Sequence, residues 1–265
     1  MGDAVLRPFI ERFAVVTAMV IAMVFVGTMA LAANNEKKSV AKPAPVKKVA
    51  IAVIGDSMAR SYCRGLTHFA RSIKSVEILC WTKPSTGLTR DDYYDWEDAL
   101  LGRLKKRTPD AAIVSMGAND AQRLVYKKKI LEFAAADWTE VYSSRVEKFI
   151  KTLNAKGSRV FWVGMPIARS ARYTKRMRHL NKIYSTNVEG NAQTFLSLWK
   201  LTQDKNGRFT RSMRDPKGRM RIARATDGIH FTKDGELIVA CYLFNSVLPQ
   251  MGIQEQPKGC RSKKK

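Results

Sequence analysis

Short apolar runs rich in β-branched residues alternate along most of the chain with longer segments whose apolar positions recur at helical spacing. The pattern predicts strands at residues 49–54, 76–79, 111–116, 159–163 and 194–198, and helices at residues 59–72, 95–107, 139–156, 176–191 and 234–248. Such alternation is typical of a parallel sheet covered by helices on both faces. We therefore expect an α/β fold with three layers, α/β/α, around about five parallel strands.

Local signals add detail to this pattern. Asp137 and Glu140 have the spacing of a capping box before the helix at 139–156, and Gly157 follows its end. Residues 204–226 are rich in Arg and Gly, which predicts an inserted loop or hairpin.

The amino-terminal segment has a different pattern. After Arg7 and Arg12, residues 13–32 form an apolar run that closes on Ala-Leu-Ala, a sequence of the kind that signal peptidase cuts after. The run is also long enough to span a bilayer, so residues 1–33 are interpreted as a signal peptide or as a retained membrane anchor. A buried core helix is the disfavoured alternative, because no polar face recurs at helical spacing. We expect a periplasmic or secreted protein, tethered to the inner membrane through residues 13–32 if the helix is retained.

Residues 34–48 shift to Lys, Ala and Pro without apolar periodicity, which predicts a solvated linker. The folded domain is expected to cover residues 49–250, and a basic tail at 251–265 follows it. No internal repeat accompanies this organisation.

Charge narrows the choice of partners. The 265 residues contain 47 Lys and Arg against 23 Asp and Glu, a net charge of +24, while 45% hydrophobic residues exclude wholesale disorder. So large a charge attracts polyanions. No nucleic-acid recognition motif accompanies it, and export favours envelope glycans and lipids over nucleic acid.

Two groups of basic residues stand out. The first follows the fourth predicted strand, and the second precedes the carboxy-terminal Asp-His pair described below. Both groups either rim a substrate crevice or form solvated faces that keep the protein soluble. Their members are Arg169, Arg172, Lys175, Arg176 and Arg178, and Lys205, Arg208, Arg211, Arg214, Lys217, Arg219, Arg221 and Arg224.

Four cysteines are too few for a disulfide-built scaffold of this length, and no pair has zinc-type spacing, so no metal is expected. Three pairings are possible in an oxidising compartment. We predict Cys63 with Cys80 and Cys241 with Cys260, the second of which would fix the carboxy-terminal tail to the last helix.

In an open parallel sheet, ligands bind beyond the carboxyl ends of the strands. The first predicted strand ends there in Gly55-Asp56-Ser57-Met58-Ala59, where a glycine permits a sharp exit and a serine can begin the next helix. The alternative is that Ser57 only caps that helix. The segment is not the nucleophile elbow of the α/β-hydrolases, because that motif needs a glycine where Ala59 stands.

The second and third predicted strands are also followed by candidate residues. Gly87 lies in the loop at 84–88 and can turn its N–H toward the same crevice. Asn119 lies in Gly-Ala-Asn-Asp at 117–120, and its amide can donate to a developing oxyanion without adding a titrating group. For both segments the alternative is an ordinary turn.

Asp227-Gly228-Ile229-His230 precedes the last predicted helix. A carboxylate three residues before a histidine can reach its Nδ1 side through a tight turn, and it then fixes the tautomer and stabilises the imidazolium. His68 and His179 fall inside predicted helices without a neighbouring acid, and they are interpreted as structural or surface residues.

The four segments in this order resemble the four sequence blocks of the SGNH, or GDSL-type, esterase and lipase superfamily over roughly residues 49–248. The resemblance implies a flavodoxin-like SGNH hydrolase fold without a cofactor. It further implies that Ser57 is the nucleophile, His230 the base and Asp227 the orienting acid.

By the same resemblance, the oxyanion hole combines the N–H of Ser57, the N–H of Gly87 and the amide of Asn119. Met58 departs from the family pattern, which has Leu there, a conservative change at a packing position. Segments 85–96, 117–122 and 227–232 are most similar to the bacterial branch catalogued as domain of unknown function 459. The resemblance does not supply a substrate for that branch.

These observations predict an exported serine esterase that hydrolyses acyl esters, O-acetyl esters foremost, of an envelope or extracellular polysaccharide. Its expected partner is an acylated small molecule or a glycan, which the charge favours as an anion. Two alternatives stay open: an O-acyltransferase that passes the acyl group to a glycan, and a non-catalytic envelope protein that binds a polyanion.

Overall fold

The computed structural model describes residues 48–188 and 193–260. The predicted signal peptide or anchor, most of the predicted linker and the last five residues of the predicted tail lie outside this part of the chain. Among the described residues, no helix combines the length and the apolar character that crossing a membrane would need.

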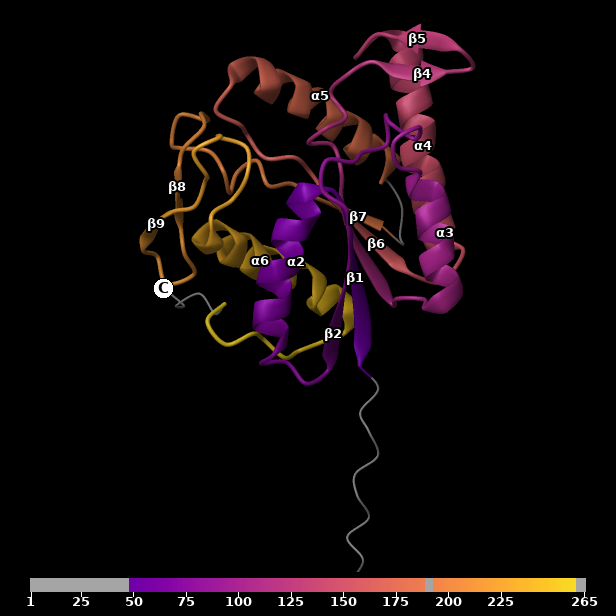
Figure 1. Cartoon of the computed structure of the whole chain (residues 1–265). Helices are drawn as coiled ribbons and strands as arrows, with labels where there is room; N and C mark the ends of the chain where they lie inside the picture. Colours follow the sequence, from indigo (N-terminus) through magenta and orange to yellow (C-terminus); the bar gives the residue numbers. More distant parts are fainter. Residues whose placement is uncertain (1–47, 189–192, 261–265) are drawn as a thin grey trace, which may run out of the picture. The chain divides into compact units, whose positions relative to one another are not determined.

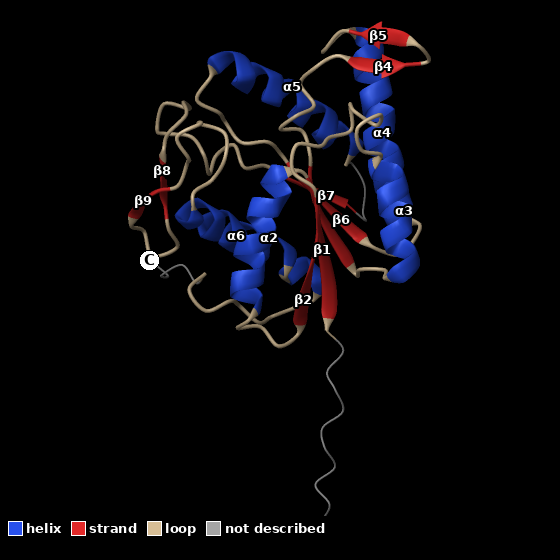
Figure 2. Cartoon of the chain, viewed as in Figure 1, coloured by secondary structure: helices blue, strands red, loops and turns tan. Residues whose placement is uncertain are grey.

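Five parallel strands form the central sheet in the order β2-β1-β3-β6-β7 (Figures 1 and 2). They are β1 (Val49–Gly55), β2 (Val76–Thr82), β3 (Ala111–Ser115), β6 (Arg159–Val163) and β7 (Gln193–Leu196). All five predicted strands are present, and β2 is three residues longer than expected. Counted along the chain, the order is that of flavodoxin-like folds, in which the direction of winding reverses between the first and third strands.

Helices cover both faces of the sheet and confirm the three-layer prediction. They are α2 (Ser57–Ala70), α3 (Trp96–Lys106), α4 (Ala136–Asn154), α5 (Ala171–Asn187) and α6 (Lys233–Val247). Alternate residues of β1 serve the two faces, since Ile51 and Val53 pack with α2 and α6, whereas Ala52 and Ile54 pack with α3, α4 and α5. A buried strand that is apolar on both sides reads as the continuous apolar run seen in the sequence.

Two helix starts differ from the predictions. The predicted capping box is wrong, because α4 begins before Asp137 and its N-cap, Ala135, has no side-chain cap. Asp137 instead lies in the first turn, where a carboxylate interacts favourably with the helix dipole. Helix α5 begins five residues earlier than predicted, because the Ser170 side chain accepts a hydrogen bond from the N–H of Tyr173.

Two antiparallel hairpins extend from the layers. One consists of β8 (Ser212–Arg214) and β9 (Met220–Ile222), within the segment predicted as a loop or hairpin. The other, β4 (Leu124–Tyr126) with β5 (Lys129–Leu131), was not predicted. Its turn residues Lys127 and Lys128 have φ of 47° and 63°, a conformation that usually requires Gly or Asn, so the sequence carries no turn signal there.

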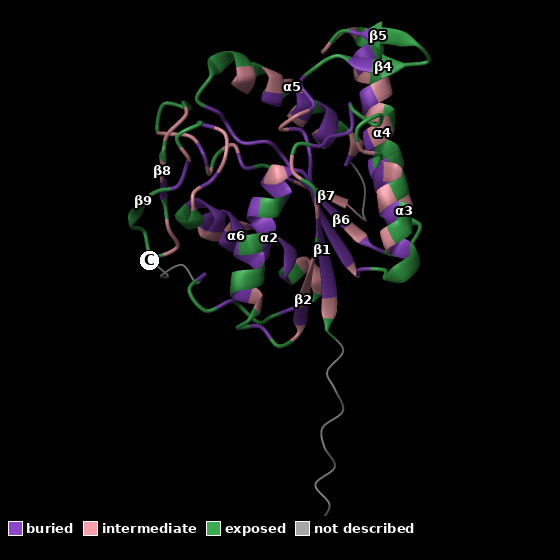
Figure 3. Cartoon of the chain, viewed as in Figure 1, coloured by how far each residue is buried: buried purple, intermediate pink, exposed green. Residues whose placement is uncertain are grey.

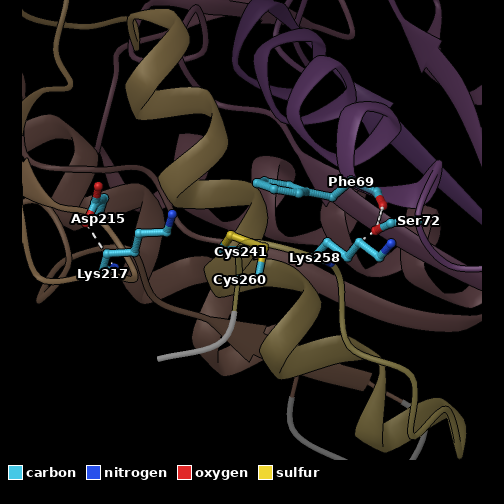
Figure 4. The surroundings of a disulfide bond; sticks show 7 residues. All are labelled: Phe69, Ser72, Asp215, Lys217, Cys241, Lys258 and Cys260. Carbon is cyan, nitrogen blue, oxygen red and sulfur yellow. Dashed lines mark hydrogen bonds between the residues drawn. A yellow bond between two sulfur atoms is a disulfide. The ribbon is translucent and has the colours of Figure 1, made fainter. Parts of the chain in front are cut away.

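Both predicted disulfides are present. Cys63 of α2 is bonded to Cys80 of β2, and Cys241 of α6 is bonded to Cys260 (Figure 4). The segment after the short helix η1 (Pro249–Met251) returns to the end of α2, where the N–H of Lys258 donates to Ser72 Oγ over 3.1 Å. The carboxy-terminal segment is therefore fixed at both α6 and α2.

Candidate active site

The turn between β1 and α2 places Ser57 at the carboxyl edge of the sheet. Gly55 has φ of 139°, and a Cβ there would lie 1.9 Å from the carbonyl oxygen of Ser115, so only glycine fits. Asp56 is the N-cap of α2 and accepts a hydrogen bond from the N–H of Met58 over 2.8 Å. The capping role considered for Ser57 therefore belongs to Asp56. As the first helical residue, Ser57 has an N–H without an acceptor inside the helix.

Ser57, His230 and Asp227 form one hydrogen-bonded chain. Ser57 Oγ lies 2.9 Å from His230 Nε2, across 173 residues of sequence. His230 Nδ1 lies 2.7 Å from Asp227 Oδ2. With the ring proton on Nδ1, the imidazole donates to the carboxylate, and Nε2 is free to accept the hydroxyl proton of Ser57.

Asp227 also fixes the turn that carries the histidine. Its Oδ1 accepts hydrogen bonds from the N–H groups of Ile229 (2.8 Å) and His230 (2.9 Å). Partial burial acts to raise the pKa of Asp227, but these hydrogen bonds and the His230 ring outweigh it and lower the pKa to about 2. Asp227 is therefore an anion at neutral pH, as stabilisation of an imidazolium requires.

Gly87 and Asn119 lie side by side through their loops. Asn119 Nδ2 donates to the carbonyl oxygen of Thr86 over 2.9 Å, which leaves the second N–H of the amide free to donate elsewhere. Gly87 packs against Asp120, and a Cβ at this position would lie 2.0 Å from Asp120 Oδ1. The two predicted oxyanion donors after β2 and β3 are thus held together.

Asp120 is the buried anchor of this arrangement. Its Oδ1 accepts from the N–H (3.0 Å) and the hydroxyl (2.9 Å) of Thr89, and its Oδ2 accepts from Tyr142 Oη over 2.7 Å. Burial raises the pKa of Asp120, and the hydrogen bonds from Tyr142 and Thr89 oppose that rise. The loop after β2 is therefore tied to the loop after β3 and to α4.

Asp56 makes the corresponding connection between β1 and β3. It is buried, and its Oδ2 accepts from the N–H of Ala118 over 3.0 Å while Oδ1 caps α2. Burial is the largest influence on its ionisation and raises its pKa to about 7, against the hydrogen bond from Met58. Asp56 stands inside the Gly-Asp-Ser segment, but no local signal in the sequence indicates that its carboxylate connects β1 with β3.

Arg224, a member of the second basic group, does not lie where the sequence predicts. It is fully buried, whereas both interpretations of its group place it at the rim of the crevice or facing solvent. Its guanidinium donates to the carbonyl oxygens of Ile167 (2.7 Å) and Ile229 (2.8 Å) and stacks on the ring of Phe231. Arg224 therefore supports the turn that carries His230, and nothing in its sequence surroundings signals this.

Two further histidines and one basic residue lie outside the hydrogen-bonded chain of Ser57, His230 and Asp227. His68 is exposed on α2, and His179 contacts Thr139 Oγ1 at 3.2 Å, so neither joins the chain at Ser57. Arg169 of the first basic group lies beside the Asp227 turn, since its N–H donates to the carbonyl oxygen of Gly228.

Comparisons with solved structures reveal similar folds. The acetyl xylan esterase AlAXEase is 17% identical with a TM-score of 0.53, over 75% of this chain and 100% of that chain. A mutant of Axe2, an acetyl-xylooligosaccharide esterase from Geobacillus Stearmophilus, is 12% identical with a TM-score of 0.56, over 77% and 96%. A GDSL-like lipase from Bacteroides thetaiotaomicron is 11% identical with a TM-score of 0.52, over 76% and 89%. The fold is therefore that of the SGNH, or GDSL-type, proteins.

No curated protein sequence matches the chain. The model of one family, described as "Protein of unknown function (DUF459)", matches residues 50–246, which include every candidate residue of the site. Since the match spans most of the sequence, the chain belongs to the DUF459 family.

Proposed function

We propose that the protein is a serine esterase that hydrolyses acyl esters through an acyl-enzyme. The observation that carries this proposal is the hydrogen-bonded chain from Ser57 Oγ through both nitrogens of His230 to Asp227. A hydroxyl, an imidazole and a carboxylate in this order are the parts that nucleophilic acyl transfer needs.

In the proposed first step, His230 Nε2 takes the proton of Ser57 while Oγ attacks the ester carbonyl. The resulting oxyanion accepts hydrogen bonds from the N–H of Ser57, the N–H of Gly87 and the free amide N–H of Asn119. Collapse of the intermediate expels the alcohol, which receives the proton from His230. Water, deprotonated by the same imidazole, then attacks the acyl-enzyme. The bond between Ser57 Oγ and the acyl carbon breaks, Oγ takes the proton back from His230, and the carboxylic acid is released.

For the substrate we propose O-acetyl groups on a glycan. Two proteins of similar fold are named as esterases of acetyl xylan and of acetyl-xylooligosaccharides, which supports this class. The amino-terminal pattern supports a periplasmic or secreted location, where such glycans occur.

The test uses Ser57→Ala and Asn119→Ala with p-nitrophenyl acetate as substrate. We expect Ser57→Ala to abolish turnover, and Asn119→Ala to lower kcat about 10²- to 10³-fold, the typical cost of one oxyanion donor. Ser144→Ala, which changes an exposed serine of α4, serves as the matched control and should retain full activity.

Labelling with a fluorophosphonate tests the nucleophile independently of turnover. Peptide mapping should place the adduct on Ser57 and on no residue of the Ser57→Ala variant. Full hydrolysis by Ser57→Ala, or an adduct on another serine, would reject the assignment.

A further inference from the structure

A groove of about 810 Å³ runs along the outer face of α2. Its other walls are the edge strand β2 and the first turn of α6. Figure 3 shows the exposed positions that follow one another along this face of α2. The groove does not include the candidate catalytic residues, but it begins beside them.

The groove lies close to the site on two elements. Arg60 comes three residues after Ser57 on α2, and Lys233 comes three residues after His230 at the start of α6. Arg71 lies at the far end of the same face, roughly 16 Å from Arg60 along the helix at 1.5 Å per residue. A chain molecule that occupies the groove would therefore have one end at the serine.

The lining is strongly basic. Arg60, Arg64, Arg71 and Lys233 all line the groove and are exposed. Glu236 is the one acidic residue among the lining residues, and its carboxylate is paired with Arg64. Three of the four cations thus have no acidic partner among the lining residues, and Thr67 and Thr82 add hydroxyl groups.

The walls of the groove are fixed to one another. The Cys63–Cys80 disulfide joins α2 to β2 within the lining. Gly65 brings α2 against α6, since a Cβ there would lie 2.5 Å from the carbonyl oxygen of Glu236. A groove held in this way loses little freedom when a ligand binds.

We propose that this groove binds an acidic glycan, a chain with carboxylate groups, and presents its acyl ester to Ser57. The inference rests on the proposed function and adds the substrate class. Unpaired cations spaced along a rigid groove complement carboxylates spaced along a sugar chain, and polar hydroxyls suit sugar hydroxyls.

The lining does not have the composition of a membrane-binding surface. Leu237 is its one large aliphatic residue, and it is half-buried. Large apolar side chains are exposed elsewhere in the described chain, for example Val125 and Ile130 on the β4–β5 hairpin and Ile222 on β9. A lipid surface needs apolar residues beside the cations, whereas a soluble polyanion does not.

The test measures binding of oligogalacturonate, a polyuronate without acyl groups, so that it needs no turnover. The groove variant combines Arg60→Gln, Arg71→Gln and Lys233→Gln, and it leaves Arg64 in place because of its pair with Glu236. The control variant combines Lys105→Gln, Lys106→Gln and Lys156→Gln, which removes the same charge at the amino edge of the sheet. Circular dichroism and thermal unfolding verify that both variants fold.

We expect the Kd for oligogalacturonate to rise about tenfold or more in the groove variant and less than twofold in the control variant. Equal rises in both variants would overturn the inference, because attraction would then follow net charge alone. Failure of the wild type to bind oligogalacturonate would also overturn it.

Phosphatidylglycerol vesicles distinguish a membrane ligand. If the groove variant lost vesicle binding while oligogalacturonate binding was unchanged, the groove would be a membrane contact and the glycan inference would be wrong. The proposed function fails separately, through retained p-nitrophenyl acetate hydrolysis by Ser57→Ala, and that result would leave the binding data intact.

Discussion

Two buried carboxylates, those of Asp56 and Asp120, connect the loops of the candidate site through hydrogen bonds. Asp56 connects the start of α2 with the N–H of Ala118, and Asp120 connects the loops that carry Gly87 and Asn119. Burial favours the neutral acid in both, and for Asp56 the pKa reaches about 7. A group whose pKa is raised by folding stabilises the fold fully below its unfolded pKa, near 4, and loses this contribution as the pH rises through its folded pKa.

Asp56→Asn tests this dependence, because an amide does not titrate. Between pH 4 and pH 7.5, the free energy of unfolding of the wild type should fall by about 3 to 4 kcal/mol relative to that of the variant. Guanidinium unfolding at several pH values with the disulfides intact measures the difference. Parallel stability curves for the two proteins would contradict the pKa assigned to Asp56.

Residues with local signals could be predicted from the sequence, and residues that act through burial could not. Ser57, Gly87, Asn119, Asp227 and His230 each follow a strand or precede a helix within a short segment of recognisable composition. The structure brings the triad residues into contact and ties the loops of Gly87 and Asn119 together, while their catalytic roles stay predictions. Arg224 resembled its exposed neighbours, because its burial depends on Ile167 and Phe231, which no local pattern connects to it.

Among the elements, those with strong apolar periodicity were predicted, as was a loop or hairpin where β8 and β9 lie, whereas the β4–β5 hairpin was not. The five strands of the sheet and all five helices are present, because each buries a face against a neighbouring layer. The β4–β5 hairpin was missed, since Lys127 and Lys128 give no turn signal. The pairing of Cys63 with Cys80 was predicted from proximity in sequence, and it joins α2 to the edge strand β2.

Replacement of both cysteines, Cys63→Ser with Cys80→Ser, tests what this link contributes. The bond closes a loop with a sequence separation of 17, for which the chain-entropy model gives about 3 kcal/mol. We expect guanidinium unfolding of the double variant to show a loss of this size. Because the double variant lacks this bond, a reducing agent should not lower its stability further through these two positions. An unchanged midpoint of unfolding in the double variant would show that the packing of α2 on β2 is sufficient for full stability.

At the scale of the molecule, sheet order places the candidate site, and charge bears on the substrate proposed for it. The winding reverses between β1 and β3, so the connections after these adjacent strands diverge, and Ser57 and Asn119 follow these two strands. The chain carries a net charge of +24, and the groove along α2 brings four of its cations together, Arg60, Arg64, Arg71 and Lys233.

The dependence on salt distinguishes electrostatic attraction of a charged ligand from hydrolysis of a neutral ester. Raising NaCl from about 0.05 M to about 0.5 M shortens the screening length severalfold, so binding of oligogalacturonate should weaken about tenfold or more. Hydrolysis of the neutral p-nitrophenyl acetate should change less than about twofold over the same range. An equal salt response of both processes would show that the charge does not capture substrate.

The distance of 173 residues between Ser57 and His230 has a consequence for how the protein is made. A chain is synthesised from its amino terminus, so the hydroxyl emerges long before its base. On the proposed mechanism, a nascent or prematurely terminated chain that ends before His230 lacks the base, and we expect it to be inactive toward esters. Since α6 follows His230 and packs in the core with α2, the proposed site is complete only when synthesis has passed this last helix.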